Sequence, residues 1–238
     1  SMENLDRENL GFGATWATSN QFSASQDSVM QFFKANLTNP EIYTTINKNT
    51  NIFLKKLGEE RVLNDQALGD QSWSAVAKLS NGNFVSVWYN TKADQDQGCS
   101  AKIMDKYGNS LYGQLTINSY TPGVQNGPSV AAFDDGGFVV SWTSFGQDGD
   151  GWGVYFQRFD NLGNKVGQET RAHTIITGHQ GYYLRDVWSA HSKVTTLTDG
   201  KFVITWGSNE TPPNGQSKIK TQIFNQDGTK FGAEFGVE

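Results

Sequence analysis

A phenylalanine and a tryptophan four residues apart occur four times in this chain, and no other feature constrains the fold as much. The four segments are 12–16, 84–88, 138–142 and 202–206. Residues i and i+4 of a β-strand lie on the same face of the strand. A sheet motif repeated along a chain is typical of an array of similar structural units. We therefore expect a repeat protein in which these Phe and Trp side chains pack between neighbouring sheets.

The sequence around the last three motifs predicts β-hairpins. An alternating apolar run precedes each Phe and ends in Asn81-Gly82, Asp135-Gly136 or Asp199-Gly200. Such dipeptides favour hairpin turns because they tolerate the positive φ that those turns require. A third strand is expected at 101–104, 154–159 and 219–224, followed by a second turn and a short fourth strand. Each copy is therefore predicted to form four antiparallel strands.

These units predict an all-β, β-propeller-like fold of about four four-stranded blades. The first blade is irregular, because the strand expected before Phe12 is missing and an extra hairpin-like stretch follows at 42–63. We place the irregular unit at residues 1–70. The other blades are expected at 71–123, 124–175 and 176–238, within a single propeller domain.

Composition excludes several classes of function. The 238-residue chain has a net charge of −5 and no basic stripe, which argues against a nucleic-acid surface. No segment approaches the roughly 20 apolar residues of a membrane span. Cys99 is the single cysteine, so an intrachain disulfide is excluded. We expect Cys99 to be a half-buried strand residue.

The third copy resembles a known type of tandem repeat. Its sequence reads Gly136-Gly-Phe-Val-Val-Ser-Trp142, then Gly146-Gln-Asp-Gly-Asp-Gly-Trp-Gly-Val-Tyr155, then Gln157-Arg-Phe-Asp160. Repeats of this form are similar to propeller-type units strung along very large secreted or surface proteins of bacteria and some protists. The resemblance covers most of residues 70–238. It implies a propeller-like fold and an extracellular or cell-surface location with an adhesion role, and it carries no catalytic residue across.

The loop after Trp142 is a candidate calcium site. Asp148 and Asp150 alternate with glycines, and carboxylates in such a pattern suit a hard cation. A complete site would need further oxygen ligands. An ordinary solvated Asp/Gly turn is the alternative, and the sequence favours it. Calcium is thus the one cofactor that the sequence offers, and no other cofactor is expected.

The junction between the third and fourth copies is longer than its counterpart between the second and third. Insertions in repeat arrays usually form loops on one face, often the binding face. Aromatic, Arg, Asp and His side chains are the types that stack on and hydrogen-bond a sugar or another polar ligand. A structural loop between blades is the alternative, and the histidine spacing does not demand a zinc site. The candidate ligand-binding residues are His179, Tyr182, Tyr183, Arg185, Asp186, Trp188 and His191.

These observations predict a non-catalytic recognition or adhesion module that binds a glycan or protein through inter-blade loops, and not an enzyme. One alternative is a structural subunit of a larger assembly. A glycan-processing enzyme is the other, although the sequence pairs no two carboxylates as sugar hydrolysis requires. An open blade edge would allow pairing with another chain, so a homodimer is a further prediction.

Overall fold

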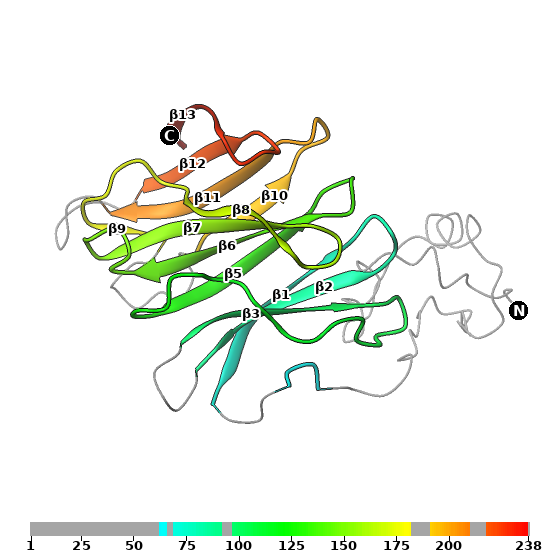
Figure 1. Ribbon diagram of the computed structural model, residues 1–238. Coiled ribbons are helices and arrows are strands. Elements are labelled where there is room, and N and C mark those ends of the chain that lie inside the picture. Colours follow the sequence, from blue (N-terminus) through cyan, green and yellow to red (C-terminus); the bar gives the residue numbers. More distant parts are fainter. Residues whose placement is uncertain (1–61, 66–68, 92–96, 182–190, 210–217, 238) are drawn as a thin grey trace, which may run out of the picture. The chain divides into compact units, whose positions relative to one another are not determined.

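The computed structural model describes residues 62–65, 69–91, 97–181, 191–209 and 218–237. The chain divides into two compact units, Ser1–Val62 and Leu63–Glu238, and the fold below is that of the second unit. Its described residues form strands and turns, with no helix among them (Figure 1). Accordingly, no helix capable of spanning a membrane occurs in the described part of the chain. The predicted all-β class is confirmed.

Three antiparallel sheets make up this unit, each in simple sequence order. The first sheet contains β1 (Gln71–Lys78), β2 (Phe84–Asn90), β3 (Gly98–Met104) and β4 (Leu115–Thr116). The second contains β5 (Gln125–Ala132), β6 (Phe138–Phe145), β7 (Trp152–Phe159) and β8 (Lys165–Arg171). The third contains β10 (Lys193–Thr196), β11 (Phe202–Asn209), β12 (Lys218–Phe224) and β13 (Lys230–Val237), and β9 (His179–Gln180) also pairs with β11.

The first hairpin of each sheet closes on the glycine that the sequence singled out. In the β1–β2 turn the Leu79 amide donates to the Asn83 carbonyl at 2.8 Å, and the Gly82 amide donates back to the Leu79 carbonyl at 3.0 Å. Gly82 has φ +85°, a conformation that costs glycine little. The equivalent Gly136 and Gly200 also have positive φ. The predicted hairpin turns are confirmed.

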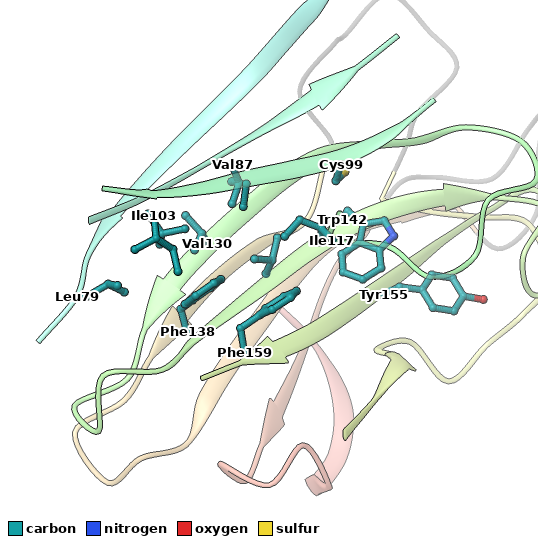
Figure 2. Close-up of a cluster of buried hydrophobic side chains, with 13 residues drawn as sticks. Leu79, Val87, Cys99, Ile103, Ile117, Val130, Phe138, Trp142, Tyr155 and Phe159 are labelled. Atoms are coloured by element: carbon teal, nitrogen blue, oxygen red, sulfur yellow. The ribbon is translucent and has the colours of Figure 1, made fainter. Parts of the chain in front are cut away.

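A hydrophobic core lies between the first and second sheets, as Figure 2 shows. Phe138, Val140 and Trp142 of β6 are fully buried in it and meet Val85 and Val87 of β2. The period of two along each strand places these residues on one face. The Phe-x-x-x-Trp motif of the third copy therefore packs against the neighbouring sheet, as its spacing predicts.

A second core repeats this arrangement between the second and third sheets. Phe202, Ile204 and Trp206 of β11 pack with Val139 and Phe156 of the second sheet. In both sheets the motif Phe stacks on its cross-strand partner. Phe138 lies 4.9 Å from Phe159 and Phe202 lies 5.0 Å from Phe224, each between ring centroids. The prediction that the motif aromatics form cores between sheets is confirmed for these two copies.

The first strands of the sheets are neighbours, since β1 lies beside β5 and β5 lies beside β10. Two of them are irregular near their start. The register shifts between Ser72 and Ala75 in β1, and between Asn126 and Ser129 in β5. A bulge bends its strand and redirects a side chain, and bulges are frequent next to functional sites.

Each predicted blade from residue 71 onward encloses one of the three sheets. The predicted first blade falls almost entirely outside the described residues, including its Phe12–Trp16 motif.

Candidate functional site

Trp73, Gly127 and His191 occupy the same place in the first, second and third sheets. Each stands eleven residues before the Phe of its own Phe-x-x-x-Trp motif. Trp73 and Gly127 fall in the bulges of β1 and β5, and His191 lies two residues before β10 begins. Because these first strands are neighbours, the three positions come together at one end of the sheets.

An aromatic cluster forms where these positions meet. The Trp73 and His191 rings lie 5.0 Å apart between centroids, and Trp73 lies 5.1 Å from Tyr89 in the same way. Gly127 makes the approach possible, because a Cβ there would lie 2.2 Å from Cγ of His191. We call Trp73, Tyr89 and His191 the aromatic cluster.

Trp73 adopts a strained backbone conformation. Its φ is +51°, and among the described residues it is the one non-glycine residue with positive φ. A bulky side chain in this region costs about 1–3 kcal/mol and persists where the surrounding structure enforces it. Strain of this kind is concentrated at active sites and ligand clamps. The observed outlier thus draws attention to Trp73 as a functional residue.

His191 is held in one tautomer by the second sheet. The Thr143 hydroxyl donates its hydrogen to Asn126 Oδ1 at 2.6 Å. Toward His191 Nδ1, 3.3 Å away, the Thr143 oxygen can therefore act only as an acceptor. Nδ1 therefore carries the hydrogen of the neutral ring, and Nε2 is the basic nitrogen. Burial, reinforced by the Lys193 charge, lowers the pKa of His191 to about 4. The ring is neutral at pH 7.

The predicted junction loop is only partly described. His191 belongs to the aromatic cluster, whereas His179 lies elsewhere: its Nδ1 accepts from the Trp152 amide at 3.4 Å, at the start of β7. The remaining candidates lie outside the described residues: Tyr182, Tyr183, Arg185, Asp186 and Trp188. The structure thus places one predicted residue in the site and another beside a different strand.

The two calcium candidates each contact protein groups. The Asp148 side chain is fully buried, with Oδ2 3.3 Å from Nε2 of the equally buried His173 side chain. Asp150 Oδ2 accepts from the Gly178 amide at 3.0 Å. In the described part of the chain, no three His, Cys, Asp or Glu side chains are grouped so as to hold a metal ion. Calcium at this loop stays a prediction, which melting with and without EDTA would test.

The sequence pointed to His191 but not to its partners. No local motif marks Trp73, Tyr89, Thr143 or Gly127 as a site residue. The signal was nevertheless present, because aligning the three motifs places Trp73, Gly127 and His191 in one column. What the sequence lacked was the information that the first strands are neighbours.

The chain resembles solved structures in its fold but matches no curated protein in sequence. No protein family model matches the chain, and no curated protein matches its sequence. An endo-arabinase from Bacteroides thetaiotaomicron is similar in structure, with a TM-score of 0.52 and 14% identity, over 83% of this chain and 80% of that one. A protein of unknown function from Dyadobacter fermentans is similar with a TM-score of 0.50 and 12% identity, over 71% of this chain and 56% of that one.

The first likeness contradicts our prediction of a non-catalytic recognition or adhesion module, and with it the prediction that the chain is not an enzyme. The fold is shared with an endo-arabinase, which favours the alternative of a glycan-processing enzyme. The sequence misled because it pairs no carboxylates in any local motif. Catalytic groups that converge from different strands leave no such local pattern. At 14% identity the likeness establishes the fold, and the activity has to be argued from the site.

Proposed function

We propose that this protein is a glycan-processing enzyme that hydrolyses glycosidic bonds at the aromatic cluster. One observation carries the proposal. The first and third sheets bring Trp73, Tyr89 and His191 together at one end of a fold that is also found in an endo-arabinase. Neither the cluster nor the fold alone would suffice, because aromatic residues also fill cores and one fold hosts many functions.

The aromatic cluster suits a sugar ring. Trp73 is only partly buried, unlike the core residues Trp142 and Trp206. Aromatic rings bury large apolar areas and can cover the apolar face of a sugar. His191 contributes a neutral imidazole ring beside this surface. Such a pairing of an apolar face with few polar groups is common in ligand sites.

Hydrolysis also requires two carboxyl groups. Asp70 stands three residues before Trp73 and is exposed, and its carboxylate accepts no hydrogen bond from the described residues. Asp148 is instead buried against His173, and Glu169 accepts from the Ser119 amide. We assign Asp70 as one catalytic carboxylate. Asp186, outside the described residues, is the carboxylate nearest to His191 in sequence and is the second residue to test.

The test is release of reducing ends from arabinan, xylan, mannan and galactan by the full chain. We expect activity on at least one polysaccharide, and a loss of about 10²–10⁴-fold in kcat for Asp70→Asn and Asp186→Asn. Asp134→Asn is the matched control, because Asp134 is exposed in the turn at the opposite end of the second sheet. No release from any polysaccharide would overturn the proposal. Full activity of Asp70→Asn would overturn its assignment.

The closure of the sheets into a propeller and the number of its blades are also part of the proposal. We infer a β-propeller of about four blades, supported by two four-stranded sheets and one five-stranded sheet, all antiparallel, in which β1 lies beside β5 and β5 beside β10. A crystal structure that shows an open stack of sheets would contradict it. An extracellular or cell-surface location and a homodimer through an open strand edge also stay predictions. Light scattering of the purified chain tests the dimer.

A further inference from the structure

A polar cavity of about 430 Å³ lies beside the aromatic cluster. It is lined from the end of β2, the start of β3 and the connection from β4 to β5. Tyr89 joins the two features: it lies against Trp73, and its hydroxyl donates to Gln97 Oε1 at 2.7 Å. Gln97 lines the cavity. A ligand bound at the aromatic cluster therefore has the cavity as its neighbour.

The cavity wall is an ordered hydrogen-bond network. Trp88 Nε1, which can only donate, bonds Asn90 Oδ1 at 2.8 Å, and this sets the orientation of the Asn90 amide. Asn90 Nδ2 consequently donates to Ser100 Oγ. On the other side the Asp65 amide donates to Gln114 Oε1 at 3.1 Å. Gln114 Nε2 then donates to Ser100 Oγ, also at 3.1 Å.

This network leaves one hydrogen unassigned. Ser100 Oγ accepts from two amide groups, so its own hydroxyl hydrogen has to be donated elsewhere. No described residue accepts it, although Ser100 is only 5% exposed and lines the cavity. A buried donor without an acceptor is costly, and a ligand oxygen in the cavity would remove that cost. Ser100 is therefore a preorganised donor.

No cationic side chain is found among the described residues that line the cavity. Its described lining contains amides, hydroxyls and the Cys99 thiol, with Asp65 as the one carboxylate. Asp65 is itself paired, with Oδ1 2.5 Å from Lys102 Nζ. Uncharged hydroxyl groups can both donate to and accept from such a wall, whereas a carboxylate would meet no positive charge in it.

We propose that this cavity is a subsite for one uncharged pentose or hexose unit, next to the unit that stacks on Trp73. The proposal rests on the proposed action on glycans and names the class of sugar. Ser100 donates to one sugar hydroxyl, and the free amide hydrogens of Gln97 reach a second. The volume lies within the ~300–1,000 Å³ of typical ligand sites. An acidic sugar is rejected because its carboxylate finds no cation.

Binding of free monosaccharides tests the subsite directly. Saturation-transfer NMR titrations would use L-arabinose, D-xylose, D-galactose and D-galacturonic acid with the full chain. Ser100→Ala removes the donor, and Thr121→Trp fills the cavity from an exposed lining position. Ser110→Ala is the matched control, because Ser110 is exposed and pairs with Met104 at the opposite end of β3.

We expect at least one neutral sugar to bind wild type and Ser110→Ala equally. Loss of one hydrogen bond in Ser100→Ala should weaken Kd about fivefold, and Thr121→Trp should abolish binding. D-galacturonic acid should bind more weakly than D-galactose. Unchanged binding in Thr121→Trp, equal binding of the acid, or no binding of any neutral sugar by wild type would each overturn the subsite. If Ser100→Ala fails to fold, the binding measured with Thr121→Trp tests whether the cavity is the sugar subsite.

The two proposals fail in different ways. Normal monosaccharide binding without release of reducing ends from any polysaccharide would contradict the hydrolase and leave the subsite standing. Polysaccharide cleavage with monosaccharide binding that neither variant changes would contradict the subsite and leave the hydrolase standing.

Discussion

The ring of Trp73 lies 5.0 Å from the ring of His191, and the two meet over the backbone of Gly127. Trp73 belongs to the first sheet, His191 lies two residues before β10 of the third sheet, and Gly127 belongs to the second sheet. The contact exists only because the middle position lacks a side chain. The position eleven residues before the motif Phe is thus occupied by Trp73, Gly127 and His191 in the three copies. The contact between the two aromatic rings requires the glycine between them.

Gly127→Ala should therefore destabilise the protein more than a change of backbone preference explains. Gly127 has φ +61°, and a Cβ there would lie 2.2 Å from the His191 ring. Gly82→Ala is the control, because Gly82 has φ +85° and no atom within 4 Å of its Cβ position. Both variants should lose about 1–2 kcal/mol through the positive φ. Gly127→Ala should lose about 1–3 kcal/mol more through the clash, measured by urea unfolding. Equal losses would contradict the close approach.

His191 should make stability depend on pH in the acid range. Its pKa is lowered to about 4 in the folded state, from about 6.5 in the unfolded chain. The unfolded state then binds the proton more readily, so stability is complete above about pH 6.5. It should fall as the pH drops from about 6.5 to 4. With allowance for partial exposure, the loss is on the order of 2 kcal/mol.

His191→Gln serves as the comparison for this titration, because glutamine keeps a polar side chain and does not titrate. Urea unfolding at pH 7.5, 6, 5 and 4 should show a steeper decline for wild type than for His191→Gln. Parallel declines in the two proteins would show that His191 does not cause the pH dependence.

Asp148 and His173 should be energetically coupled. Both side chains are buried, 3.3 Å apart, and His173 Nδ1 is held 2.9 Å from the Ile175 carbonyl. Removing one partner leaves the other buried and unpaired, so Asp148→Ala and His173→Ala should each cost about 1–3 kcal/mol. The double variant should cost less than the sum of the two. Asp150→Ala, in the same exposed loop, should cost less than Asp148→Ala. Additive losses in urea unfolding would show that the pair is not coupled.

Phe138→Ala should produce one of the largest losses of stability in the chain. Phe138 is fully buried and stacks on Phe159 in the core between the first two sheets. Truncation there should cost about 3–5 kcal/mol. Phe231→Ala is the control, because its side chain is 52% exposed on β13. Its unfolding midpoint should shift far less, and comparable losses would argue against the core between the sheets.

Local features of the fold could be predicted from sequence because they depend on neighbouring residues. Period-two alternation around Phe138 and Phe202 predicts strands with one buried face, and Asp-Gly before each predicts a turn. The bulge at Trp73 could not be predicted, because it depends on pairing with β2. The proximity of Asp148 to His173 could not be predicted either, since the two are distant in sequence and only the fold of the second sheet brings them together.

The sequence by itself determined the repeat, its strands and turns, and the aromatic residues of the cores between sheets, because these follow from side-chain spacing along single strands. Only the tertiary structure decided the candidate site. Trp73, Tyr89, His191 and Gly127 come from three sheets, and the donor at Ser100 emerges from a network that joins β2, β3 and the residues after Leu63. Contacts between strands are set by how sheets associate, and spacing along one strand carries no record of that.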